Sequence, residues 1–158
     1  MSLASSVSRS FRIWALAEAS AVSCAVASAP PPTTEVTVFV VTTVPAAMVE
    51  MAIDPADTGG THVAGTRGAT EMRTLDAFRI GDLDFLKIDC EGYELEVLKG
   101  ARETLARCRP CIIVEQKPHK LAANYGAKGK PAVDFLLALG LGYVLRREMG
   151  GDFILSCG

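Results

Sequence analysis

The middle of the chain changes from a strand-like apolar run to a helical stripe. Residues 85–88 form a short, mainly apolar run of the kind found in a buried strand, and the run ends at Asp89. Gly92 follows, a residue that permits a turn with positive φ. Over 95–105 apolar side chains recur at helical spacing with charged ones between them, which predicts one amphipathic helix. The pattern therefore predicts a buried strand, a turn and a helix in succession.

Shorter stretches elsewhere carry the same kinds of signal. Runs rich in Val, Ile and Thr predict further strands, and Pro131 before an apolar stripe predicts a second helix. The glycine-rich stretch 54–68 and the polar stretch 117–130 predict loops. The predicted strands are 35–44, 49–53, 71–75 and 110–116, the second helix is 131–141, and 143–147 and 153–157 form a terminal hairpin.

The order of these elements predicts an α/β fold. Strands 84–89 and 110–116 are consecutive and joined by a helix, so they are expected to lie parallel with a right-handed crossover. The last two strands are separated by Gly150, Gly151 and Asp152, which suit a tight antiparallel connection. The predicted sheet is mostly parallel and ends in an antiparallel hairpin.

Composition excludes one class of partner and suggests a compartment. The 158 residues suit one domain with one core. The formal net charge is -2 and aromatic residues make up 6%, so no nucleic-acid partner is expected. Five cysteines, an odd number without framework spacing, indicate a reducing compartment, and we expect a cytoplasmic protein. Cys108 and Cys111 fall where a helix meets a strand, so we expect core or boundary cysteines there.

Residues 1–33 differ in composition from the rest of the chain. They are rich in Ala and Ser, and a mainly apolar run over 13–29 contains Glu18 and precedes three prolines. The acidic residue interrupts the core that a signal peptide needs, and the run is marginal for a bilayer span of about 20 residues. We expect a poorly ordered leader or an aberrant start here, with no strand before Glu18 and no stable membrane insertion.

Acidic residues gather at the predicted carboxyl ends of two neighbouring strands. Asp89 and Glu115 end these strands, and Glu91 and His119 lie just beyond them. The ends of parallel strands open onto one edge of a sheet, where α/β proteins bind ligands. Such a cluster could supply a general base, contacts to hydroxyl groups or oxygen ligands for a hard cation. We take these four residues as candidate catalytic residues and predict no dedicated metal site.

Structural roles compete with the functional ones. Asp89 and Glu91 are suited to accept backbone N–H groups in the turn before the helix. Lys87 shares a strand face with Asp89 and is expected to pair with it. His119 falls in a polar stretch and His62 in a glycine-rich one, where a solvated histidine is the usual occupant.

An ordered series of short motifs runs from Leu75 to Glu115. The motifs are LDAF at 75–78, DFLKIDCEGYE at 84–94, LKGA at 98–101, RP at 109–110 and IVE at 113–115. This series resembles the C-terminal half of FkbM-type methyltransferases, S-adenosylmethionine-dependent enzymes that mostly O-methylate sugars and natural products. The resemblance implies a partial Rossmann-like methyltransferase sheet, S-adenosylmethionine as cofactor and a small-molecule hydroxyl acceptor.

The chain departs from that family at its N-terminal end. Rossmann-like methyltransferases hold the donor on a glycine-rich turn after the first strand, whereas the first glycine here is Gly59. We therefore expect an incomplete domain over 34–158, with uncovered apolar faces and an unpaired strand edge that favour self-association. Three functions stay open: a methyltransferase, a non-catalytic remnant or binding module of the same fold, and a carboxylate–metal hydrolase built on Asp89 and Glu115.

Overall fold

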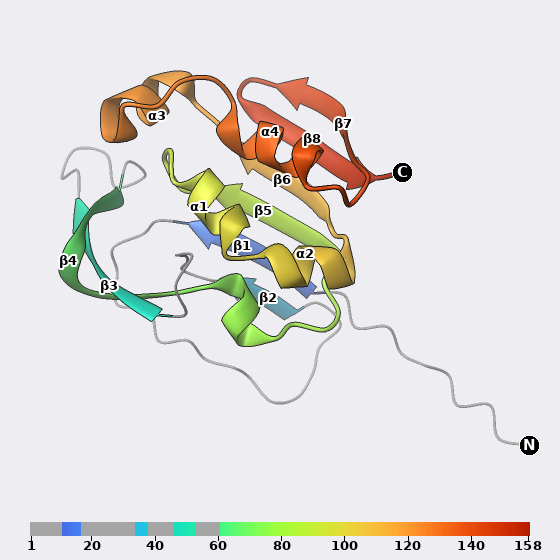
Figure 1. The fold of residues 1–158 in the computed structure, drawn as a ribbon, viewed down its shortest axis with the longest axis horizontal. Helices are drawn as coiled ribbons and strands as arrows, with labels where there is room; N and C mark the ends of the chain where they lie inside the picture. The colour runs from blue at the N-terminus through green and yellow to red at the C-terminus, as the bar shows by residue number, and fades with distance from the viewer. Residues whose placement is uncertain (1–10, 17–33, 38–45, 53–60) are drawn as a thin grey trace, which may run out of the picture.

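The protein is a mixed α/β structure (Figure 1). The computed structural model describes residues 11–16, 34–37, 46–52 and 61–158. The strands are β1 (Phe11–Leu16), β2 (Thr34–Thr37), β3 (Ala46–Ala52), β4 (His62–Arg73), β5 (Phe85–Asp89), β6 (Cys111–Glu115), β7 (Tyr143–Met149) and β8 (Asp152–Cys157). The helices are the 3-10 helix η2 (Leu75–Phe78), α1 (Glu94–Lys99), α2 (Arg102–Cys108), α3 (Pro118–Tyr125) and α4 (Pro131–Ala138).

Two sheets contain all of these strands. The larger is six-stranded with the order β2-β1-β5-β6-β8-β7, and β3 and β4 form a separate antiparallel pair. In the larger sheet β1 pairs in parallel with β2 and β5, and β5 with β6, whereas β8 is antiparallel to both β6 and β7. The predicted terminal hairpin is confirmed. The larger sheet is mixed, and the second sheet was not predicted.

A strand inside the first 33 residues corrects one prediction. β1 lies between β2 and β5, so a strand does precede Glu18. The prediction failed because the Ala/Ser composition of the whole segment concealed six residues, Phe11–Leu16, that are mainly apolar. The expectation of poor order concerns 1–10 and 17–33, which lie outside the described residues.

Alternate residues of the central strands point into one hydrophobic core. Leu86 and Ile88 on β5, and Ile112 and Val114 on β6, are at most 1% exposed. Helices α1, α2 and α4 lie over this face of the sheet (Figure 1), and their apolar residues join the same core. Lys87 and its neighbours on the opposite face of β5 are only half-buried. The apolar run of β5 is therefore covered more fully on one face than on the other.

The stripe after β5 forms two short helices in place of the single predicted helix. α1 ends at Lys99 and α2 begins at Arg102. The carboxylate of Asp76 caps the start of α2, because its Oδ2 and Oδ1 accept the N–H groups of Glu103 at 3.0 Å and Thr104 at 2.8 Å. Periodicity could not show this break, since the capping residue lies 27 positions before Glu103.

Asp76→Ala is expected to lower the free energy of unfolding by about 1–2 kcal/mol, because two N–H groups at the start of α2 lose their acceptor. Urea denaturation followed by circular dichroism measures the loss. Asp76→Asn keeps one acceptor oxygen and should lose less. Equal stability of wild type and the alanine variant would contradict the capping role.

The segment 54–68, expected to be a loop, is partly a strand. β4 begins at His62 and pairs with β3 near both of its ends, with register shifts around Glu50 that leave residues 66–69 without a partner in β3. It ends before Thr74, whose Oγ accepts the N–H of Ala77 at 3.1 Å and caps the 3-10 helix η2. The predicted strand over 71–75 is therefore the end of a longer one. Residues 53–60 lie outside the described part of the chain.

The polar stretch 117–130, expected to be irregular, contains helix α3. Pro118 opens the helix, where its missing N–H costs nothing, and Gly126 ends it in the left-handed conformation with φ 64°. Only Leu121 of this helix is buried. One buried apolar residue gives too weak a periodic signal to reveal a helix, although the Pro and Gly at its two ends mark it.

The four described cysteines are free. Cys108 ends α2 and Cys111 begins β6, which confirms that the pair sits at a helix–strand boundary. Cys108 packs against the hydrophobic core. Cys24 lies outside the described residues.

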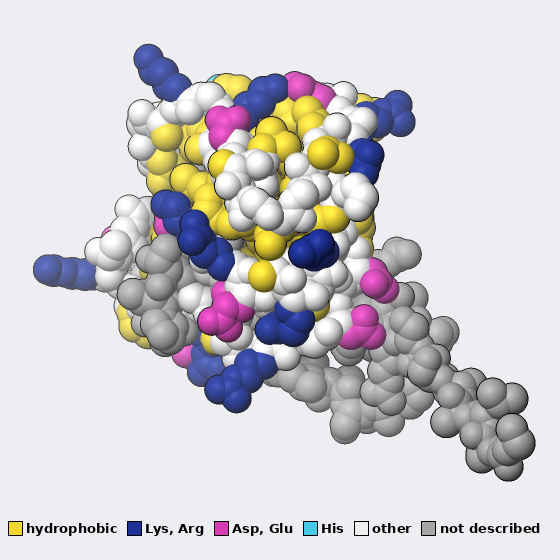
Figure 2. Space-filling view, turned by 45° about the vertical axis from the view of Figure 1, so that its right-hand side comes forward, with side chains coloured by type: hydrophobic (Ala, Val, Ile, Leu, Met, Phe, Trp, Pro, Cys, Tyr) yellow, Lys and Arg dark blue, Asp and Glu magenta, His cyan; other side chains and the backbone are white. Residues whose placement is uncertain are grey.

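The exposed surface carries several large apolar side chains. Val144, Leu145 and Met149 are 40%, 41% and 49% exposed on β7, and Leu137 is 47% exposed on α4. Figure 2 shows hydrophobic side chains gathered on the upper part of one face with Lys and Arg around them. β7 is an edge strand of the larger sheet, so self-association stays a prediction, now centred on this edge.

No helix in the described part of the chain is long and apolar enough to cross a membrane.

Candidate active site

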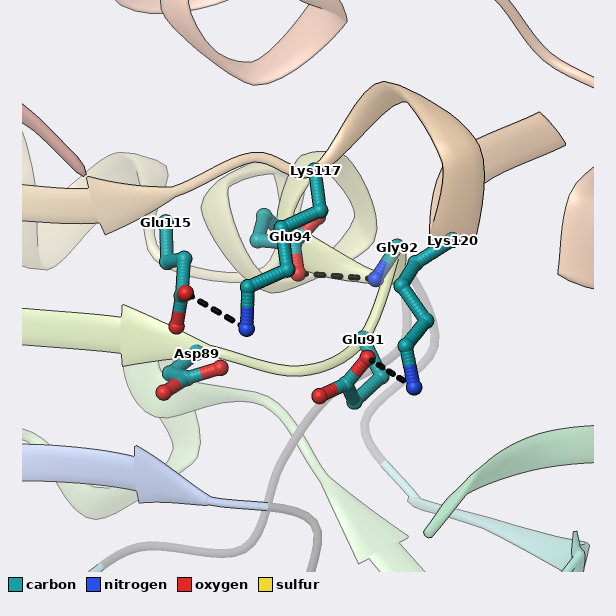
Figure 3. A pocket seen from close by; sticks show the side chains of 7 residues that line it. All are labelled: Asp89, Glu91, Gly92, Glu94, Glu115, Lys117 and Lys120. Atoms are coloured by element: carbon teal, nitrogen blue, oxygen red, sulfur yellow. Dashed lines mark hydrogen bonds and ion pairs between the residues drawn. The ribbon is translucent and has the colours of Figure 1, made fainter. Parts of the chain in front are cut away.

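Two carboxylates meet at the carboxyl ends of β5 and β6. The parallel register pairs Ile88 with Val114, so Asp89 and Glu115 come together one residue further along. Their side chains are 22% and 16% exposed and lie close together at the two strand tips (Figure 3). The structure thus places the first two candidate residues at the same sheet edge.

Burial and mutual proximity separate the pKa values of these two carboxyl groups. Burial, reinforced by the hydrogen bond and the charge of Glu115, raises the pKa of Asp89 to about 6. For Glu115, burial alone would raise the pKa, but the hydrogen bond from Asp89 and the ion pair with Lys117 outweigh it and lower the pKa. The pair therefore carries its last proton on Asp89, which ionises near pH 6.

Two lysines compensate the charge of the pair. Lys87 Nζ lies 3.4 Å from Asp89 Oδ2, which confirms the predicted pairing on one strand face. Lys117 Nζ lies 2.6 Å from Glu115 Oε1, and this hydrogen bond raises the pKa of Lys117. Lys117 is 37% exposed, so water weakens this ion pair. Both carboxylates nevertheless have a cation beside them.

A left-handed turn connects β5 to α1. Glu91 and Gly92 have φ values of 52° and 108°, and the N–H of Tyr93 donates to the carbonyl of Cys90 at 3.1 Å. Glu94 Oε1 accepts the N–H groups of Cys90 at 3.1 Å and Gly92 at 2.8 Å. Positive φ at a non-glycine residue is unfavourable, so this carboxylate helps to hold a strained turn.

The role of accepting backbone N–H groups in the turn belongs to Glu94, whereas Asp89 and Glu91 were the predicted acceptors. Glu91 instead lies 3.3 Å from Lys120 through Oε2 and is 9% exposed. The backbone carbonyl of Glu91 accepts a hydrogen bond of 2.9 Å from Asn124 Nδ2. Glu94 lies in the first turn of α1, where the helix dipole favours any acidic residue, so its position in the sequence does not single it out.

Aromatic residues line the α3 side of the turn. The ring of Tyr125 packs on Gly92, where an added Cβ would come within 2.7 Å of the ring. Tyr93 and Tyr125 have ring centroids 5.7 Å apart, and His62 meets Tyr125 edge-on at 6.4 Å. The hydroxyl of Tyr125 donates to the carbonyl of Val63 at 3.0 Å, which links α3 to β4. Sequence reasoning missed both tyrosines.

The charged residues at the strand ends and in the turn surround a small hollow that opens to solvent. Its empty volume is about 150 Å³, and the residues that line it are Asp89, Glu91, Gly92, Glu94, Glu115, Lys117 and Lys120 (Figure 3). Three of the four candidate residues therefore meet here. His119 is exposed in the first turn of α3 and is not part of the lining. Across residues 61–158 and the shorter described stretches, no three His, Cys, Asp or Glu residues are arranged to hold a metal ion.

Open α/β sheets bind ligands at the carboxyl ends of their parallel strands, and Asp89 and Glu115 lie at such an edge of this sheet. The Methyltransferase FkbM domain family matches residues 33–145, and the chain belongs to this family. The match confirms the resemblance noted between Leu75 and Glu115. No curated protein and no solved structure matches the chain.

Proposed function

We propose that the protein transfers a methyl group from S-adenosylmethionine to a hydroxyl group of a sugar or natural product, with Asp89 as the general base. The observation that carries this proposal is the pair of Asp89 and Glu115 at the strand ends of a methyltransferase-family sheet. A carboxylate with a pKa of about 6 is ionised at neutral pH yet basic enough to accept a proton from a polarised hydroxyl.

The described residues divide the work of deprotonation. Asp89 accepts the hydroxyl proton, and Glu115 stays ionised beside it because Lys117 lies 2.6 Å away. Lys87 Nζ, 3.4 Å from Asp89 Oδ2, offsets the negative charge of Asp89 while Asp89 is ionised. Once Asp89 takes up the proton, this ion pair no longer exists. The remaining contribution is to hold the hydroxyl oxygen in line with the methyl group, which is a matter of positioning.

The described residues do not form a complete cradle for the methyl donor. S-adenosylmethionine supplies a methyl group on a sulfonium, and a molecule of its size needs a pocket of roughly 300–1,000 Å³. The hollow beside Asp89 cannot enclose such a molecule, since its empty space is only about 150 Å³ even with the open solvent at its mouth included. The positions after Leu16, where β1 ends next to β5, are 17–33 and lie outside the described residues. Use of this donor is therefore proposed from family membership.

Calorimetric titration of S-adenosylmethionine into the full chain, followed by a methyl-transfer assay on a panel of sugars and natural products, tests the function. Micromolar binding with transfer to a hydroxyl supports the proposal. Saturable heat from acceptors without any transfer would identify a binding module of the same fold. Absence of donor binding at millimolar concentration would reject methyl transfer for this chain.

Methyl transfer is expected to increase with pH and level off above pH 6, because Asp89 acts in its ionised form and its pKa is about 6. The measurement is kcat/KM between pH 4.5 and 8.5 at constant ionic strength. A rate that falls over this range would show that the essential group acts as an acid.

A further inference from the structure

We propose that the outer edge of β7 binds an extended acidic segment of another protein, which adds to the larger sheet as a new outer strand. The edge lies beyond β8, and β8 separates it from β6, the strand that ends at Glu115. The surface is therefore distinct from the candidate active site, and the inference goes beyond the proposed function without resting on it.

β7 is the outermost strand of the larger sheet on the side of the C-terminal hairpin (Figure 1). It pairs with β8 along one side, and among the described residues no strand pairs with its other side. Residues 144–149 are all exposed. The outward backbone N–H and C=O groups of such a strand can pair with an added extended segment. The edge therefore selects a partner in extended conformation over a helix.

The register with β8 divides the side chains of β7 between the two faces of the sheet. Leu145 is opposite Leu155, which is fully buried in the core, so Leu145 lies on the face that α4 covers. Arg147 is opposite Ile154, the next residue along β8, so it lies on the other face. Val144 shares that second face and is 40% exposed.

Positive charge exceeds negative charge on this second face of the hairpin. Arg146 falls at the register shift in β7, and its guanidinium donates to two neutral acceptors, Ser156 Oγ at 2.9 Å and the carbonyl of Cys157 at 3.1 Å. Arg147 is exposed and forms no ion pair within the described part of the chain. Asp152 is the carboxylate of β8 on this face. Two arginines and one carboxylate leave the edge with net positive charge.

The acidic residue of β7 itself does not neutralise these arginines. Glu148 is opposite Phe153, whose side chain is buried in the core, so it belongs to the face that α4 covers. Both carboxylate oxygens of Glu148 lie 2.9 Å from Lys130 Nζ. An added strand therefore meets a neutralised ion pair on one face and excess positive charge on the other. This difference favours an acidic residue opposite Arg147, with apolar residues on either side of it.

The same charges make a second copy of β7 a poorer partner. Antiparallel pairing of two β7 strands in full register would bring the arginines of both copies together, and like charges opposite one another are destabilising. Salt screens attraction and repulsion alike. It should therefore weaken the binding of an acidic strand and strengthen the pairing of two copies, so the direction of the salt dependence separates these two occupants.

Nuclear magnetic resonance of the isotopically labelled full chain tests the proposal with three peptides as long as β7, each acetylated and amidated. In the first, threonine and valine alternate from a threonine, and glutamate replaces the central valine. The second has lysine at that position, and the third is the glutamate peptide with its backbone nitrogens methylated. We expect saturable shifts of amides 144–149 with the glutamate peptide, about tenfold weaker binding of the lysine peptide, and no binding of the methylated one.

Arg147→Gln supplies the matched variant, and its fold is not at risk because the side chain is exposed. Affinity for the glutamate peptide should fall by about two- to fivefold, the effect of one exposed ion pair. Raising the salt concentration from about 50 to about 500 mM should have a similar effect on wild type. Arg67→Gln changes an exposed arginine of β4, outside the larger sheet, and should bind as wild type does.

Several results would overturn the proposal: no saturable shift within residues 144–149, equal binding of the lysine peptide, equal binding of the methylated peptide, or wild-type affinity in Arg147→Gln. Shifts of the same amides that grow with protein and salt concentration in the absence of peptide would assign the edge to a second copy instead. No methyl donor takes part in these measurements, so none of the results decides the proposed function.

Discussion

Replacing Asp89 with Asn is expected to lower kcat/KM for methyl transfer by about 10²–10⁴-fold, the usual contribution of a positioned general base. Asn cannot accept the hydroxyl proton, but it resembles protonated Asp89 in shape and can donate to Glu115. The strand register that brings residues 89 and 115 together does not depend on the charge. The loss should therefore appear without unfolding.

The same substitution is expected to stabilise the fold above pH 6. The pKa of Asp89 is raised from 3.8 to about 6, so the folded state binds this proton more tightly and loses stability as the pH rises through that interval. Asn does not ionise and so avoids this loss. The free energy of unfolding of the variant should exceed that of wild type by about 1–2 kcal/mol at pH 8, and the difference should vanish near pH 4. Thermal unfolding of wild type and variant at both pH values measures it.

Asp134→Asn is a suitable control, because Asp134 is exposed on α4 and is not among the residues that line the hollow. It should change neither the rate nor the pH dependence of stability. An Asp89→Asn protein that keeps more than about a tenth of wild-type activity would exclude Asp89 as the base.

Gly92→Ala is expected to destabilise the protein by about 3 kcal/mol, through backbone strain and overpacking together. Gly92 has φ 108°, which L-residues rarely adopt, and a Cβ there would come within 2.7 Å of the Tyr125 ring and 3.2 Å of Leu121 Cα. The ring could rotate aside only by giving up its hydrogen bond to Val63. The Leu121 contact is with the backbone of α3, which would have to move by a few tenths of an ångström.

Gly126→Ala separates the two causes. Gly126 also has positive φ, 64°, but a Cβ there meets nothing within 4 Å, so only strain of about 1 kcal/mol should result. Urea denaturation of both variants gives the comparison. Gly92→Ala should cost less stability in a Tyr125→Ala background than in wild type, because the ring that the Cβ would meet is then gone. Equal losses for the two glycine variants would contradict the proposed contact between the turn and α3.

The local pattern predicted the strand, the turn and the meeting of Asp89 with Glu115, because these depend on short apolar runs and on the parallel pairing of consecutive strands. The helical stripe after β5 and the terminal hairpin were predictable for the same reason. Family membership could be read from the motifs between Leu75 and Glu115 and was then confirmed.

Other features depend on partners distant in sequence. The break between α1 and α2 depends on the cap that Asp76 provides. The position of the Tyr125 ring beside the turn depends on its hydrogen bond to Val63, which lies 62 positions earlier. Helix α3 buries only Leu121, so its sequence shows no repeating apolar pattern that would predict a helix. Glu94 looked like an ordinary residue of the first helical turn, and only the structure shows which backbone groups its carboxylate accepts.

The turn at residues 90–93 gives the site two parts with different freedom to vary. Its floor, from Asp89 to Glu94, is one continuous stretch held by its own hydrogen bonds. The wall comes from elsewhere: Asn124 and Tyr125 of α3 touch the floor through one carbonyl and one ring face. The floor thus depends on hydrogen bonds within six consecutive residues, so substitutions at Asn124 or Tyr125 can change how α3 supports the turn while the two hydrogen bonds to Glu94 remain.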